Sequence, residues 1–148
     1  DVDPDSDETP RSEVESPSQL KEASLSILCI DNEPDILDGM QLLLGRWGHT
    51  VHPALGMKEA LLNIGKHGVP HLVLVDFHLD RNENGLEVMT EIEQEVGAPL
   101  PAIVITADRS TALEEKVAGR GYGLLRKPIK PAALRVLINN VIKSTGAA

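Results

Sequence analysis

The sequence predicts an α/β fold in which a doubly wound, five-stranded parallel sheet carries helices on both faces. Three observations support this prediction. From Ser26 onward, short apolar runs alternate with longer segments in which apolar residues recur at helical spacing. The connections between these segments are short, as in β-α-β units that share one sheet. The 148 residues suffice for one domain, whereas a closed eight-fold barrel needs roughly 250 residues.

The first two strands and helices are predicted within residues 26–68. The run "SILCI" is strand-like, and the apolar helical face that follows it stops at Gly48. The segment "HTVHPA" predicts a short strand, and Pro53 favours an edge position because proline cannot donate a ladder hydrogen bond. A second helical face begins at Met57 and ends in "HGVP".

The remaining three units follow the same order. The run "HLVLV" predicts a strand buried on both faces, and the helix after it carries Leu86, Met89 and Ile92. "PAIVI" predicts the fourth strand, with a weaker helix near residues 109–119. "YGLL" predicts the fifth strand, and the final helix has an apolar face that begins at Leu134.

Composition excludes several classes of function. The formal net charge is −9 and only 2% of the residues are aromatic, so we expect no nucleic-acid partner. No window approaches about 18 continuous apolar residues. We therefore expect a cytoplasmic domain that makes no membrane contact, and leave open that a longer parent chain is attached to a membrane. The single cysteine, Cys29, lies in an apolar run and is interpreted as a core residue.

Residues 1–24 differ in composition from the rest of the chain. They hold eight acids, two bases and three prolines, with almost no large apolar residues. This composition predicts a disordered acidic linker, with an acidic interaction motif as the less favoured alternative.

Polar side chains follow the apolar runs at the strand ends. The stretch "PHLVLVDFHLD" places a carboxylate, Asp76, at the end of a buried strand. The first strand is followed by Asp31 and Asn32, the fourth by Thr106, and the fifth by Lys127. Because ligands of open parallel sheets collect beyond the carboxyl ends of the strands, we expect these side chains to share one site.

The residue types at these ends point to phosphoryl chemistry. Carboxylates on neighbouring strands repel each other unless a cation lies between them, and oxygen ligands favour a hard ion such as Mg²⁺. A hydroxyl and an ammonium on the opposite side can hold a phosphoryl group against that ion. The central carboxylate of Asp76 could then act as the nucleophile and form an acyl phosphate.

The chain resembles the receiver domain of two-component response regulators over about residues 25–144. The resemblance depends on four motifs in order: "ILCIDNEPDIL", "LVLVDFHLDRNENGLE", "AIVITAD" and "LLRKPIKPAALRVLI". It implies the flavodoxin-like strand order 2-1-3-4-5. Together with the composition of residues 1–24, it divides the chain into a linker of residues 1–24 and a receiver domain of residues 25–148.

The resemblance assigns a role to each residue of the expected site. Asp76 is the phosphoacceptor, Thr106 the switch hydroxyl and Lys127 the phosphate-binding lysine. Mg²⁺ is held by Asp31, Asn32, Asp76 and the backbone carbonyl of His78. The Lys127–Pro128 bond is commonly cis in the family.

The resemblance also implies partners and a signalling role. The phosphoryl group comes from a histidine kinase or a histidine phosphotransfer domain in a phosphorelay. The helix near 109–119, the fifth strand and the last helix change surface shape in response. Two features suggest the C-terminal receiver of a hybrid sensor histidine kinase: the acidic segment before the domain, and a resemblance of the stretch "CIDNEPDILDGMQLLLGRWG" to that subgroup. The sensory input, the partner histidine, the direction of phosphoryl flow and the oligomeric state stay open.

Two positions depart from the family pattern. Receiver domains usually have two adjacent acids after the first strand, and here the second is Asn32, whose amide can ligate but brings no charge. We therefore expect weaker Mg²⁺ binding, partly offset by Glu33. At Leu124 the family often has an aromatic residue that rotates on activation, and Tyr122 lies two residues earlier. The sequence therefore does not predict an aromatic switch.

Simpler interpretations of the same residues stay open from the sequence. Asp76 taken alone could be an ordinary helix cap or loop acid, and either Thr106 or Asp108 could cap the helix that follows the fourth strand. Lys127 taken alone indicates a solvated surface charge. For the whole domain, the alternative is a receiver-like interaction module that is not phosphorylated, with a metal site weakened by Asn32. A flavodoxin-like nucleotide binder ranks last, because no glycine-rich loop follows the first strand.

Overall fold

Five strands and five helices alternate along residues 24–80 and 83–144, which are the residues described by this computed structural model. The strands are β1 (Ser26–Ile30), β2 (Thr50–Ala54), β3 (Leu72–Asp76), β4 (Ala102–Thr106) and β5 (Gly123–Arg126). The helices are α3 (Pro34–Arg46), α4 (Met57–His67), α5 (Gly85–Val96), α6 (Thr111–Gly119) and α7 (Pro131–Ser144). The predicted linker, residues 1–24, lies outside the described residues apart from Ser24.

The strands form one parallel sheet in the order β2-β1-β3-β4-β5, which confirms the predicted doubly wound topology. β2 lies at one edge, as Pro53 predicted, and β5 lies at the other. In the register of the sheet, Asp76 pairs with Ile105 and Thr106 pairs with Arg126. The carboxyl ends of the central strands therefore reach the same rim.

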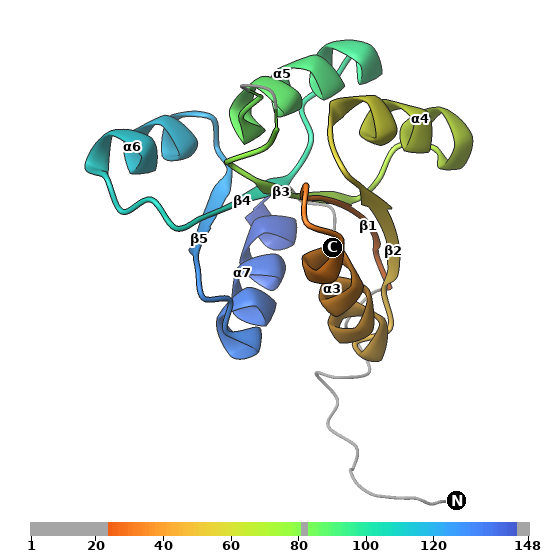
Figure 1. The fold of residues 1–148 in the computed structure, drawn as a ribbon, viewed down its shortest axis with the longest axis horizontal. Helices are drawn as coiled ribbons and strands as arrows, with labels where there is room; N and C mark the ends of the chain where they lie inside the picture. The colour runs from red at the N-terminus through yellow and green to blue at the C-terminus, as the bar shows by residue number, and fades with distance from the viewer. Residues whose placement is uncertain (1–23, 81–82, 145–148) are drawn as a thin grey trace, which may run out of the picture.

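Different helices cover the two faces of the sheet. α3 and α7 lie on one face, and α4, α5 and α6 lie on the other (Figure 1). The central strand β3 supplies both cores: Leu72 and Leu74 pack in the cluster beneath α3 and α7. Val73 and Val75 pack in the cluster beneath the other three helices. This alternation explains why residues 72–75 of the strand are all apolar. A carboxylate at the next position, Asp76, is therefore unusual.

Burial also settles the role of the single cysteine. The side chain of Cys29 is 2% exposed, and burial raises the pKa of its thiol to about 12. A thiol held in its protonated form is a poor nucleophile. Cys29 is therefore a core residue, as its apolar surroundings in the sequence indicated.

The start of α6 differs from both sequence-based alternatives. The cap is Ser110, whose side chain accepts a hydrogen bond from the backbone N–H of Leu113. Neither Thr106 nor Asp108 caps the helix. The Asp108 carboxylate instead accepts from the N–H of Ser110 at 2.8 Å, so it orders the turn just before the cap. The helix accordingly begins at residue 111 rather than 109.

Among the residues that the structure describes, no helix is long and apolar enough to cross a membrane.

Candidate functional site

Two buried carboxylates lie at the ends of neighbouring strands. Asp31 directly follows β1, and Asp76 is the last residue of β3; they are 6% and 5% exposed. Burial raises the pKa of Asp31 above its usual value, and the charge of Asp76 raises it further. A backbone hydrogen bond from Glu33 and the charge of Lys127 act in the opposite direction on that pKa. The two carboxylates therefore repel each other across the rim.

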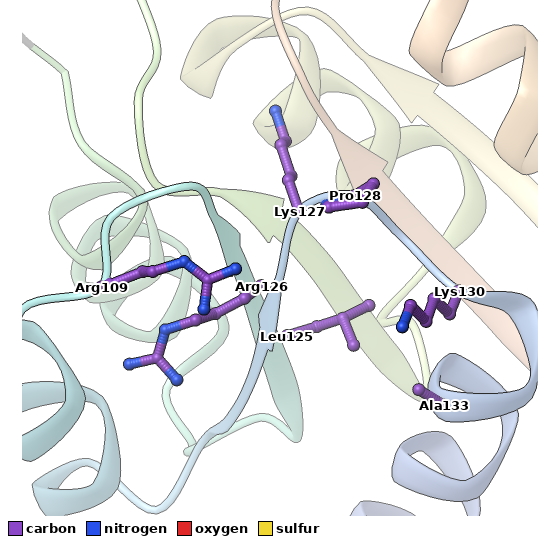
Figure 2. Close-up of a pocket in the computed structure, with 7 residues that line it drawn as sticks. All are labelled: Arg109, Leu125, Arg126, Lys127, Pro128, Lys130 and Ala133. Atoms are coloured by element: carbon purple, nitrogen blue, oxygen red, sulfur yellow. The ribbon is translucent and has the colours of Figure 1, made fainter.

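Asp76 has a separate contact at each of its carboxylate oxygens. The ammonium nitrogen of Lys127 lies 3.4 Å from Oδ2, and the backbone N–H of His78 donates to Oδ1 at 3.4 Å. Figure 2 shows the Lys127 ammonium projecting away from the guanidinium of Arg126, its neighbour in the chain. This divergence follows from strand alternation, which turns successive side chains to opposite sides. Lys127 is therefore a partner of the phosphoacceptor candidate rather than only a solvated surface charge.

Thr106 lies next to this pair and is fully buried. Its hydroxyl oxygen accepts a hydrogen bond from the backbone N–H of Asp108 at 3.0 Å. Its backbone carbonyl accepts from the N–H of Lys127 at 2.8 Å. The Lys127–Pro128 bond is cis, as expected from the family pattern. Thr106 and Lys127 are thus held side by side at the ends of adjacent strands.

Asn32 faces a residue that sequence reasoning did not single out. Its side-chain nitrogen Nδ2 donates to Oδ1 of Asp80 at 2.8 Å, across 48 positions of the chain. Glu33, the acid expected to offset Asn32, stands at the N-terminal cap of α3 and donates its backbone N–H to the Asp31 carboxylate at 2.9 Å. The acid bonded to the asparagine side chain therefore comes from the loop after β3. The sequence signal was only one more acid in a polar loop.

The donor set at this rim fits a hard cation. In the described parts of the chain, no three side chains of Asp, Glu, His or Cys converge closely enough to hold a metal ion. The rim nevertheless brings together two buried carboxylates, Asp31 and Asp76, with the amide of Asn32 beside them. The ammonium of Lys127 neutralises only one of these two acids, so a net negative charge is left that attracts a cation. Oxygen donors of this kind suit Mg²⁺.

The backbone of Asp76 is fixed by a glycine of the following helix. A Cβ at Gly85 would lie 2.8 Å from the carbonyl oxygen of Asp76 and 3.2 Å from the Cα of Phe77. The N–H of Gly85 also donates to the carbonyl of Phe77 at 2.8 Å. The start of α5 is therefore pressed against the end of β3, an approach that only glycine permits.

Comparison with known proteins identifies the family. The family model of the response regulator receiver domain matches residues 27–139, which is most of the chain. This chain belongs to the response regulator receiver domain family. It is therefore a receiver domain of two-component signalling, and the buried acids, threonine and lysine described above occupy its carboxyl-end rim.

Individual relatives and solved structures are similar to this receiver domain. One relative is a protein of Leptolyngbya boryana, described as an uncharacterized 14.6 kDa protein in the sodA1 3′ region. It is 32% identical over 123 residues, which cover 78% of this chain and 88% of the relative. The structure of NtrX from Brucella abortus superposes with a TM-score of 0.74 at 26% identity, covering 84% of this chain and 28% of that chain. The chemotaxis protein CheY4 of Vibrio cholerae gives a TM-score of 0.72 at 21% identity, covering 80% of this chain and 99% of that one, and supports the fold alone.

The receiver domain has no exposed aromatic residue at the position where the family often has a switch. Leu124 is partly buried and packs against the core beneath α4, α5 and α6. Tyr122 is 9% exposed and joins the same core. Burial and a side-chain hydrogen bond with Glu93 raise the pKa of its hydroxyl, which keeps the phenol neutral. Tyr122 is therefore a core residue and does not substitute for a rotating aromatic side chain.

Proposed function

We propose that this receiver domain accepts a phosphoryl group on Asp76 from a phosphohistidine of a histidine kinase or a histidine phosphotransfer domain, in the presence of Mg²⁺. The single observation that carries the proposal is the contact between the buried Asp76 carboxylate and the Lys127 ammonium at 3.4 Å, beside the second buried acid, Asp31. Acids are rarely buried unless they are paired or bind a cation. Here two of them lie at one rim beside an ammonium, an arrangement that suits phosphoryl transfer to a carboxylate.

The chemistry follows from these contacts. A carboxylate oxygen of Asp76 attacks phosphorus, the P–N bond to the donor imidazole breaks, and the electron pair of that bond returns to the imidazole nitrogen, which takes a proton. The Lys127 ammonium neutralises the equatorial oxygens of the phosphoryl group. Asp31, Asp76, the Asn32 amide and the His78 carbonyl would hold Mg²⁺, which when bound supplies positive charge to the same oxygens.

Two residues would carry the change from the site to the surface. The Thr106 hydroxyl, which accepts from the Asp108 N–H, stands at the end of the strand next to β3, from which it can turn toward a phosphoryl group on Asp76. The backbone carbonyl of Thr106 accepts a hydrogen bond from the N–H of Lys127, so a movement of either residue would also shift the end of β5. We propose that the surface formed by α6, β5 and α7 responds.

That surface carries a cavity of about 320 Å³ with a cationic lining (Figure 2). Its charged residues are Arg109, Arg126, Lys127 and Lys130. In a chain of formal net charge −9, this concentration of positive charge favours an acidic segment on the partner that reads the phosphorylated state. Lys127 belongs to both the cavity and the phosphorylation site, so it links the two.

We also propose that this receiver domain is part of a longer signalling protein. The acidic composition of residues 1–24 and the sequence of the first strand and helix favour a receiver of a hybrid sensor histidine kinase, and we propose a cytoplasmic location for it.

The test is phosphorylation by a small donor. The chain is incubated with acetyl phosphate and Mg²⁺, and its intact mass is measured beside that of Asp76→Asn. A gain of one phosphoryl group in the native chain, absent from the variant, supports the proposal. No gain in the native chain would favour the alternative, a receiver-like interaction module that is not phosphorylated.

A further inference from the structure

We propose that Asp80 is a positioning residue of the magnesium site, which orients the Asn32 amide and returns the negative charge that asparagine lacks. The inference rests on the proposed function, since it concerns the Mg²⁺ that the phosphorylation site would bind. The observation that carries it is the 2.8 Å hydrogen bond from Asn32 Nδ2 to Asp80 Oδ1.

The chemistry of the amide makes this hydrogen bond consequential. An asparagine side chain ends in an oxygen, which can bind a cation, and in an NH₂ group, which cannot. An ionised carboxylate only accepts hydrogen bonds, so Asp80 selects the NH₂ end of Asn32. The amide oxygen is thereby turned to the other side of the group. Without Asp80, the amide could rotate and present its NH₂ group to the metal, which would be repulsive.

The backbone on either side of residues 81–82 is joined by hydrogen bonds. The N–H of Glu83 donates to the carbonyl of Asp80 at 3.1 Å, and the N–H of Leu79 donates to the carbonyl of Glu83 at 3.2 Å. One step further out, His78 and Asn84 form an antiparallel bridge. Asn84 is also the cap of α5, in a reciprocal capping box with the glutamate three residues later. Backbone hydrogen bonds therefore hold the backbone of Asp80, from which its carboxylate reaches the Asn32 amide.

Asp80 acts through Asn32 and not as a direct ligand. Among the residues that the structure describes, its carboxylate does not form a three-acid cluster with Asp31 and Asp76. A carboxylate one hydrogen bond away from a metal ligand is a common arrangement, because it fixes the orientation of the ligand and adds charge close to the ion. The usual adjacent pair of acids is thus replaced by an asparagine after β1 and an acid after β3.

The experiment measures Mg²⁺ binding directly, by isothermal titration calorimetry of the full chain without any phosphoryl donor. The test variant is Asp80→Ala, which removes both the acceptor and the charge. The matched control is Asp38→Ala, because Asp38 is an exposed acid of α3 whose removal changes net charge equally. The same Asp80→Ala change is also made in an Asn32→Asp background, in which position 32 has no amide to orient.

We expect Asp80→Ala to weaken Mg²⁺ binding by about 10-fold or more, the range seen for residues that orient metal ligands. Asp38→Ala should bind nearly as the native chain does. In the Asn32→Asp background, loss of Asp80 should cost much less, which reveals the coupling between the two positions. Urea unfolding of each variant, with the native midpoint retained, verifies that the fold is intact.

Failure of the inference can be told apart from failure of the proposed function. If the native chain binds Mg²⁺ and Asp80→Ala binds it equally well, or loses no more affinity than Asp38→Ala, the role of Asp80 is overturned while the site stands. An equal loss in the native and Asn32→Asp backgrounds would also overturn it. If the native chain binds no Mg²⁺ at millimolar concentrations, the proposed function fails, and the inference fails with it.

Discussion

Gly85, the first residue of α5, lies against the backbone of Asp76, such that a Cβ at position 85 would come within 2.8 Å of the Asp76 carbonyl oxygen. Real Cβ atoms do not approach a backbone oxygen this closely, and neither side of the contact is a flexible side-chain end. The helix and the strand end must therefore separate if any side chain is introduced. Because Asp76 is the proposed phosphoacceptor, this contact ties the packing of the fold to the geometry of the site.

Replacement of Gly85 by alanine should both destabilise the fold and disturb the site. We expect Gly85→Ala to lower the free energy of unfolding by about 1–3 kcal/mol, the usual range for overpacking, and to slow phosphoryl uptake. Urea denaturation and a time course with acetyl phosphate measure the two effects. Gly65→Ala is the control: Gly65 lies within α4, where a Cβ would meet no atom within 4 Å, so stability should rise slightly. Unchanged stability and uptake in Gly85→Ala would contradict the assigned close approach.

The buried charge of Asp31 predicts a pH-dependent gain in stability when it is removed. Its pKa is raised in the folded state by burial and by Asp76. At pH values between the ordinary pKa of about 3.9 and the raised one, the Asp31 carboxyl is therefore protonated to a greater extent in the folded protein than in the unfolded chain. Stability therefore falls as the pH rises through the interval between that ordinary value and the raised one.

We accordingly expect Asp31→Asn to raise the free energy of unfolding at pH 7 by about 1–2 kcal/mol. The gain should shrink as the pH is lowered and vanish well below about 3.9, where the carboxyl is protonated in the folded and the unfolded state alike. Added Mg²⁺ should raise the melting temperature of the native chain more than that of the variant. Asp38→Asn, at an exposed position, is the control. A gain that does not depend on pH would exclude charge burial as its cause.

We propose that His78 affects the lifetime of the acyl phosphate. Its backbone N–H contacts Asp76, and its side chain is exposed. We expect His78→Ala to speed dephosphorylation several-fold, because a smaller side chain leaves the aspartyl phosphate more open to water. The loss of phosphoryl mass with time measures the rate. His78→Gln, which keeps most of the bulk, should fall between the two, and equal rates in all three proteins would rule out this role.

The buried hydroxyl of Thr106 should matter for the response more than for the chemistry. Thr106→Val keeps the shape but leaves the Asp108 N–H without its acceptor, which should cost about 1–2 kcal/mol of stability. Phosphoryl uptake should persist, while the chemical-shift changes that phosphorylation causes in α6 and β5 should shrink. Thr106→Ser restores the hydroxyl and should restore the changes. If Thr106→Val responds as the native domain does, the threonine is not the switch.

Much of the fold and part of the site could be predicted because they depend on strong local signals. The run Leu72–Val75 is apolar on both sides, which only a central strand between two helical layers explains. Once the strands are placed, Asp31, Asp76 and Lys127 must meet, because the carboxyl ends of parallel strands share a rim. Pro53 likewise marked the edge strand through its missing N–H.

The parts that escaped prediction depend on contacts between polar residues far apart in the chain. Nothing in the sequence singles out Asp80 from neighbouring loop acids, and its position is set by backbone hydrogen bonds with Glu83. The start of α6 was ambiguous because several cap-forming residues occur close together, and Ser110 proved to be the cap. The closeness of Gly85 to Asp76 depends on how a helix meets a strand, which sequence periodicity does not report.

Phosphorylation of Asp76 is tested most sharply by locating the phosphoryl group on the chain. After treatment with acetyl phosphate and Mg²⁺, borohydride reduction converts an aspartyl phosphate to homoserine, and peptide mass spectrometry then finds the modified residue. We predict homoserine at position 76 and no modification in a Lys127→Ala, Asp31→Asn double variant treated identically. Modification at another residue, or none in the native chain, would contradict the proposed role of Asp76.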